Sequence, residues 1–115
     1  MVKEVYCSYE LSKLLKEKGF EISAPNSIPC VYYDYKNRIY GYTHQNVMKW
    51  LREEKKIIIE ISYNKAAMLG TFINFTFSAV NINKGEEHIH LDNYDTYEEA
   101  TEKAIMYAIE NGWID

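Results

Sequence analysis

The stretch THQNVMKWLREEKKIIIEI, residues Thr43–Ile61, changes from a helical to a strand pattern without a linker and so decides the fold class. Thr43 can cap a helix, and Val47, Trp50 and Leu51 recur at the spacing of one helix face. The β-branched run that follows the helix is typical of a buried strand. This stretch therefore predicts a helix that leads directly into a strand.

Two more strands are predicted after this one. Residues 71–82 alternate apolar and polar side chains, and a shift of phase near Val80 and Ile82 predicts a bulge or a strongly twisted strand. Residues 86–92 alternate again, with Ile89 and Leu91 expected to fill the core side. Because the links between the strands are short, the three are predicted to form an antiparallel meander.

Helices are predicted on both sides of these strands. Ser8 can cap a helix that ends near Lys18, and Thr96–Glu99 has the pattern of a capping box at the start of the last helix. Val31–Tyr35 and Arg38–Tyr42 are expected to form a hairpin, which can join either edge of the meander, so the sequence leaves the strand order open. We therefore expect an α+β fold, in which an antiparallel β-meander of three to five strands packs against about three helices, a single layer of helices on one sheet face.

The composition bounds the size and the environment of the protein. Its 115 residues, of which 47% are hydrophobic and 26% charged, fit one globular domain spanning residues 1–115. The longest apolar runs are far shorter than a membrane span, the first residues lack the pattern of a signal peptide, and the two cysteines form no disulfide framework. We therefore expect a cytoplasmic protein that has no membrane partner.

The formal net charge of −4 is unevenly distributed along the chain. Residues 1–56 hold 10 basic and 7 acidic side chains, whereas residues 57–115 hold 3 basic and 10 acidic ones. Nucleic-acid binding usually goes with a clustered basic surface in a basic domain, so a nucleic-acid partner is disfavoured. The acidic second half instead raises the hypothesis of an acidic inhibitor that blocks a nucleic-acid-binding protein.

One segment carries a candidate metal site. Glu86, His88, His90 and Asp92 share one face of a predicted strand, and imidazole with carboxylate is a ligand set for zinc or iron. The alternative is that these four residues are the solvated face of an edge strand, because alternation with Ile89 already predicts polar side chains there. A metal ion is the cofactor that this segment allows.

Two further groups of residues are candidates for function. Cys7 with His44 or His90 has the residue types of a thiol nucleophile and its base, although free cysteines are more often simply buried. The chain also holds 11 tyrosines, several of them clustered in the predicted hairpin. That cluster is interpreted either as filling of a small sheet or as a protein-contact patch, since tyrosine is enriched at interfaces. Its members are Tyr32, Tyr33, Tyr35, Tyr40 and Tyr42.

Three segments in order resemble a family of small uncharacterised proteins that phages, prophages and other mobile elements of gut Bacteroidetes encode. They are CSYELSKLLKEKGF (Cys7–Phe20), YTHQNVMKWLREEKKIIIEI (Tyr42–Ile61) and YDTYEEATEKAIMYAIENGWI (Tyr94–Ile114), about half of the chain. The segment Ala66–Asp92 matches no family that we can name. The resemblance implies a protein made inside a bacterial host, and it implies no activity, cofactor or catalytic residues.

The sequence therefore favours a small non-catalytic protein-interaction module whose partner is another protein or a second copy of itself. It contains neither a glycine-rich phosphate loop nor a nucleophile or zinc-protease motif. The alternatives that remain are a metal-binding protein or metal-dependent enzyme that uses His88 and His90, and the acidic inhibitor.

Overall fold

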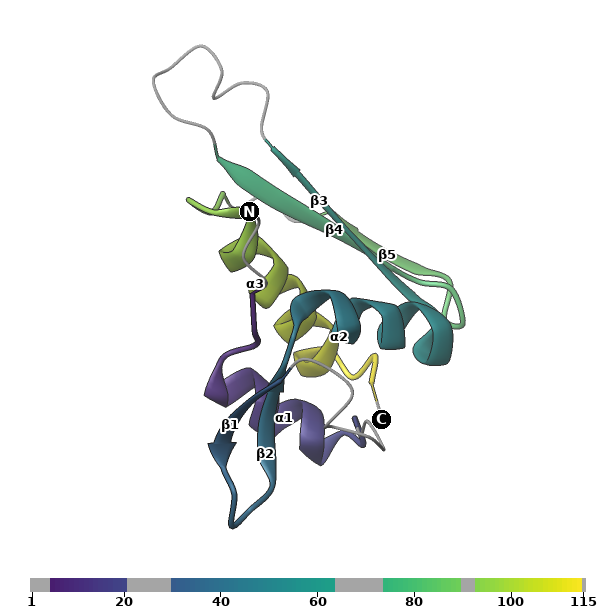
Figure 1. The fold of residues 1–115 in the computed structure, drawn as a ribbon. Helices are drawn as coiled ribbons and strands as arrows, with labels where there is room; N and C mark the ends of the chain where they lie inside the picture. Colours follow the sequence, from purple (N-terminus) through teal and green to yellow (C-terminus); the bar gives the residue numbers. More distant parts are fainter. Residues whose placement is uncertain (1–4, 21–29, 64–73, 90–92, 115) are drawn as a thin grey trace.

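The computed structural model describes residues 5–20, 30–63, 74–89 and 93–114 (Figure 1). The predicted order of elements is confirmed in these residues. The elements are α1 (Tyr9–Glu17), β1 (Cys30–Asp34), β2 (Ile39–Tyr42), α2 (His44–Trp50) with a π-helical turn η2 (Leu51–Lys55), β3 (Ile57–Tyr63), β4 (Phe75–Asn81), β5 (Glu86–Ile89) and α3 (Tyr97–Glu110). The fold is α+β, as expected.

The main sheet is the antiparallel meander β3-β4-β5, with helices on one of its faces (Figure 1). Helix α3 lies directly against β4 and β3. Its contact stripe includes Ala100, Ala104 and Ala108, all fully buried, and these small side chains let the helix approach the sheet closely. Helix α3 therefore covers this face of the meander, whereas α1 packs against β2 and α3.

The β1–β2 hairpin forms a separate two-stranded sheet, and in the described residues it joins neither edge of the meander. The hairpin is held instead by the segment that precedes α1, through the bridge between Tyr6 and Thr43. Gly41 permits this close approach, because a Cβ there would lie 2.8 Å from Val31 Cγ2 and 3.0 Å from the Cys7 carbonyl oxygen. The hairpin is thus fixed to the N-terminal segment and to α1.

Strand β4 keeps one phase along its whole length, so the bulge predicted near Val80 is wrong. Its register with β3 is continuous over seven residue pairs. Asn81 lies on the buried face, and its side-chain oxygen accepts a hydrogen bond from the Lys84 N–H in the following turn. Because the polar Asn81 occupies a buried position in order to cap this turn, the sequence shows an apparent change of phase where the strand has none.

The two faces of β5 are the reverse of what the alternation suggested. Ile89, expected in the core, is 64% exposed. Glu86 and His88 instead pair with Asn81 and Ala79, whose side chains lie on the helix-covered face. Alternation defines two faces of a strand but does not show which face is covered. In β5 the polar face is the covered one, because Tyr107 and Trp113 provide partners for His88 and Glu86.

The junction between the second helix and the first strand of the meander has a left-handed residue. Lys56 adopts φ 57° and ψ 40°, its N–H donates to the Leu51 carbonyl, and its carbonyl accepts from Ile82. A side chain in this conformation costs about 1–2 kcal/mol, which glycine avoids.

We predict that Lys56→Gly raises the free energy of unfolding by about 0.5–1 kcal/mol, because the gain at the left-handed position exceeds the added chain entropy. Urea denaturation measures this. Lys55→Gly is the matched control, one residue earlier in η2, and it is expected to destabilise by about 1 kcal/mol. A destabilised Lys56→Gly would contradict the account of this junction.

Candidate functional site

The two described members of the predicted strand site face α3 and the residues after it. An Oε2 atom of Glu86 accepts a hydrogen bond from Trp113 Nε1 at 2.8 Å, and the His88 ring stacks on Tyr107 with centroids 4.0 Å apart. His90 and Asp92 lie outside the described residues. Metal binding by Glu86, His88, His90 and Asp92 therefore stays a prediction, and the two described side chains have protein partners.

Three of the hairpin tyrosines form an aromatic cluster on the protein surface. Tyr32 and Tyr35 stack nearly parallel, with centroids 4.9 Å apart and an interplanar angle of 4°, and Tyr40 meets Tyr32 edge-on. Tyr32 is 46% exposed and Tyr35 is 73% exposed. We call Tyr32, Tyr35 and Tyr40 the hairpin cluster.

The other two tyrosines attach the hairpin to the rest of the protein. The Tyr33 hydroxyl donates to the Cys7 carbonyl oxygen at 2.5 Å. Tyr42 is buried and packs edge-on against Phe20, while its carbonyl accepts from the Cys7 N–H. The five tyrosines therefore divide into three that stack together on the hairpin and two that attach it, although the Tyr33 side chain is itself 40% exposed.

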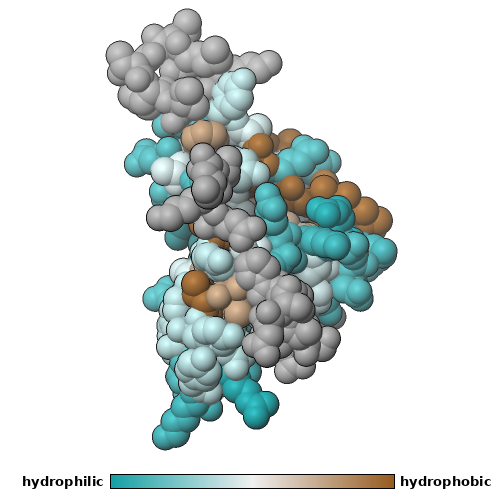
Figure 2. All heavy atoms as spheres, viewed as in Figure 1, coloured by the Kyte–Doolittle hydropathy of each residue, from teal (hydrophilic) through white to brown (hydrophobic). Residues whose placement is uncertain are grey.

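A second exposed surface lies on the open face of the meander. Ile58, Ile82 and Ile89 are 37%, 55% and 64% exposed on that side, and Glu60 and Glu87 lie among them. Figure 2 shows the corresponding hydrophobic patch over the β3–β5 region. We call this surface the open sheet face.

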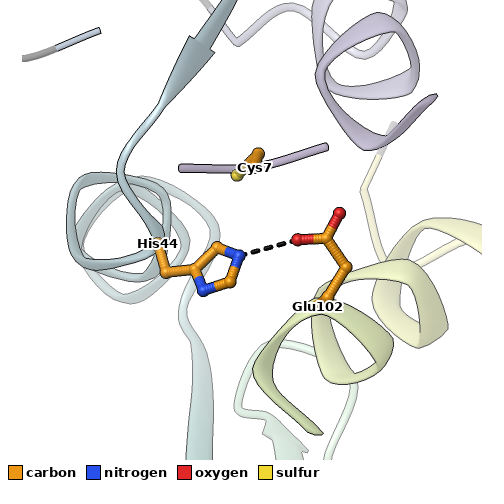
Figure 3. Close-up of side chains that lie close together, drawn as sticks. All are labelled: Cys7, His44 and Glu102. Atoms are coloured by element: carbon orange, nitrogen blue, oxygen red, sulfur yellow. Dashed lines mark hydrogen bonds and ion pairs between the residues drawn. The ribbon is translucent and has the colours of Figure 1, made fainter. Parts of the chain in front are cut away.

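The structure also brings together three side chains that are far apart in the sequence. Cys7 precedes α1, His44 is the first residue of α2, and Glu102 lies in the first half of α3 (Figure 3). One ligand atom from each lies within 4.8 Å of the other two. Cys7 is fully buried, and the side chains of His44 and Glu102 are 8% and 20% exposed.

Glu102 uses both carboxylate oxygens in this cluster. One oxygen lies 2.7 Å from His44 Nε2, and the other accepts a hydrogen bond from the Ser8 N–H at 3.0 Å. Burial by itself raises the pKa of Glu102, but the hydrogen bonds from His44 and Ser8 outweigh it and hold the pKa below the ordinary value of 4.5. The carboxylate is therefore ionised and fully engaged.

Cys7 lacks the features of an activated nucleophile. Burial, and then the negative charge of Glu102, raise the pKa of the Cys7 thiol far above its ordinary value. A reactive cysteine requires a thiolate and access to its substrate, and Cys7 has neither in this arrangement. The pair Cys7 and His44, one of two that the sequence suggested, is thus adjacent in space without the properties of a thiol enzyme.

Sequence reasoning did not single out Glu102. A signal was present, because Glu102 precedes Ile105 by three residues and Ile109 by seven, so it lies on the flank of the buried stripe of α3. A carboxylate in that position needs a buried partner. The sequence could not indicate that the partner is His44, 58 residues away.

Comparison with known protein families, with curated proteins and with solved structures gave no match.

We predict that the Glu102 carboxylate makes stability depend on pH. Its pKa is lower in the folded chain than in the unfolded chain, so its contribution is present above about pH 4.5 and is lost as the pH falls through the lowered pKa. Glu102→Gln should cost about 1–2 kcal/mol at neutral pH and less in acid. Urea unfolding at several pH values measures this. Glu110→Gln, on the exposed end of α3, is the control, and a pH-independent cost at Glu102 would contradict the prediction.

A second prediction concerns the two thiols. In the native protein we expect a disulfide reagent to modify the half-buried Cys30 quickly, and to modify Cys7 only on unfolding. Counting modified thiols with time in native and denatured protein measures this, and Cys30→Ser should remove the fast phase. A fast phase that survives in Cys30→Ser would show that Cys7 is an accessible thiolate after all.

Proposed function

We propose that this protein is a non-catalytic protein-binding module and that the hairpin cluster is its contact surface. The observation that carries the proposal is the stacked pair Tyr32 and Tyr35, which is exposed at 46% and 73% on a hairpin separate from the main sheet. Aromatic side chains at the surface are a compositional mark of protein interfaces.

The hairpin cluster is ordered before any partner arrives. The side chain of Asp34 accepts hydrogen bonds from the backbone and the side chain of Asn37, which closes the turn, and Lys16 donates to the Asn37 carbonyl oxygen. The Tyr33 hydroxyl attaches β1 to the segment before α1, through its hydrogen bond to the Cys7 carbonyl oxygen. A stacked pair on a stiff turn loses little side-chain entropy on binding, so it can contribute more of its contact energy to affinity.

The charges around the hairpin cluster indicate the chemistry of the partner. Lys36 and Arg38 stand in the turn against the single acidic residue Asp34, so the turn is basic although the chain has a net charge of −4. Opposite charges face each other across protein interfaces. The partner surface is therefore expected to combine apolar or aromatic side chains with acidic ones.

The alternative of an acidic inhibitor has less support from the described residues. Glu60 and Glu87 share the open sheet face with exposed isoleucines, Glu98 lies on α3, which packs against β3 and β4, and Glu102 is engaged inside the protein. A mimic of nucleic acid needs a contiguous acidic surface. Its binding would fall steeply with added salt, whereas a contact through stacked tyrosines would fall only modestly.

The cellular setting of the proposal comes from the family resemblance. It implies a protein of phages, prophages or mobile elements that acts in the cytoplasm of a bacterial host, on a host or phage protein or on a second copy. In the described part of the chain, none of the helices has the length and apolar character needed to span a membrane.

The test is to capture the partner from a gut Bacteroidetes lysate, identify it, and measure its affinity with purified proteins. We predict that Tyr32→Ser combined with Tyr35→Ser weakens binding at least about 30-fold, because central aromatic residues contribute about 2 kcal/mol or more each. Tyr63→Ser is the matched control, since Tyr63 is 53% exposed at the far end of β3. Its affinity should be unchanged.

Two other results would overturn parts of the proposal. Loss of binding in Ile82→Ser combined with Ile89→Ser, but not in the tyrosine variant, would move the contact surface to the open sheet face. Light scattering of the purified protein, with and without the tyrosine substitutions, decides whether the partner is a second copy. Turnover of a small molecule by the purified protein would reject a non-catalytic module.

A further inference from the structure

We propose that Cys7, His44 and Glu102 form a binding site for one divalent transition-metal ion of the zinc class. The three ligand atoms come from three different parts of the fold and lie within 4.8 Å of one another in a largely buried position (Figure 3). This site is distinct from the hairpin cluster, and the proposal goes beyond protein binding.

The donor atoms select the kind of ion. A thiolate, an imidazole and a carboxylate are all ligands of Zn²⁺, and the thiolate disfavours Mg²⁺ and Ca²⁺, which prefer oxygen. The ionised Cys7 and Glu102 side chains together balance the two positive charges of the ion, so the buried site would carry no net charge. A buried ion is stable only where its charge is compensated in this way.

The side chains need to move only a short distance to bind the ion. Tetrahedral zinc with bonds of about 2.0–2.3 Å places its ligand atoms roughly 3.3–3.7 Å apart. The His44 Nε2 and Glu102 Oε2 atoms, now 2.7 Å apart, would separate by less than about 1 Å, and the sulfur of Cys7 would move inward by a similar amount. Rotations of the side chains supply such movements without a change in the backbone.

Neighbouring groups hold the ligands in place. The Ser8 N–H binds one oxygen of Glu102 and leaves the other free to turn from His44 to the ion. The backbone of Cys7 is fixed on both sides, because its N–H donates to the Tyr42 carbonyl and its carbonyl accepts from the Tyr33 hydroxyl. Supporting hydrogen bonds of this type orient the ligands of known metal sites.

Metal binding displaces protons from the ligand atoms of Cys7 and His44. The thiol of Cys7 releases its proton to solvent. The proton on His44 Nε2, which now binds the Glu102 carboxylate, leaves by exchange with solvent, and the ring keeps one proton on Nδ1 so that Nε2 can coordinate. The Nε2–Oε2 hydrogen bond is replaced by two bonds to the ion. Three protein ligands leave a fourth position for water, which can reach the site from the partly exposed side of Glu102.

The experiment is a titration of tag-free, chelator-treated protein with Co²⁺, which takes the place of zinc and gives an absorption band when a thiolate binds it. We expect one equivalent of Co²⁺, a thiolate-to-cobalt charge-transfer band, and displacement of the cobalt by one equivalent of Zn²⁺. Cys7→Ser should abolish the charge-transfer band. His44→Ala and Glu102→Gln should each weaken Co²⁺ binding at least about 10-fold.

Matched controls are available for two of the ligands. Cys30→Ser removes the other cysteine, and His88→Ala combined with His90→Ala removes the other histidines, so both proteins should keep the band. Zn²⁺ should also raise the melting temperature of the wild-type protein, which shows binding even where a ligand variant fails to fold. Absence of both the band and the melting shift in wild type, or loss of the band only in Cys30→Ser or in the His88 and His90 variant, would overturn the proposal.

Discussion

The arrangement of the three helices is tied together by one largely buried carboxylate, that of Glu102. Glu102 must have partners for both oxygens, because an ionised side chain in this position would otherwise destabilise the protein. Its two partners are the N–H of Ser8, where α1 is capped, and the ring of His44, the first residue of α2. One side chain of α3 thereby holds the first residues of two other helices in place. Ser8 is separated from Glu102 by 94 positions in the sequence, and His44 is separated from it by 58.

The position of the hairpin depends on this contact between Glu102 and the N-terminal segment. Cys7 lies between the hairpin and α3. Its backbone is hydrogen-bonded to Tyr33 and Tyr42, and these bonds attach the hairpin to the N-terminal segment. The hairpin is therefore positioned by α1 and the segment before it, and among the described residues no strand of the meander pairs with it. This separation is what leaves Tyr32 and Tyr35 exposed, whereas tyrosines within a continuous sheet would be covered on one face.

Local signals in the sequence were sufficient to predict the helices and strands. They were not sufficient to predict which face of β5 is covered or that Cys7, His44 and Glu102 lie together. Ser8, Thr43 and Thr96 act as helix caps as predicted, because a cap needs only residues three positions apart. The covered face of β5 was predicted incorrectly, because its partners are distant in sequence: Tyr107 of α3 stacks on His88, and Trp113, which follows α3, binds Glu86. Contacts between Glu102 and His44 have no local signature, so only the folded chain brings them together.

The open sheet face has a consequence for how the protein behaves in concentrated solution. Three exposed isoleucines on the outer side of a meander form an adhesive surface, and such sheets tend to stack or to pair at their edges. Glu60 and Glu87 lie among these isoleucines and give every copy the same charge there, so two copies repel one another when they approach face to face. These two carboxylates therefore limit self-association of the protein through the open sheet face.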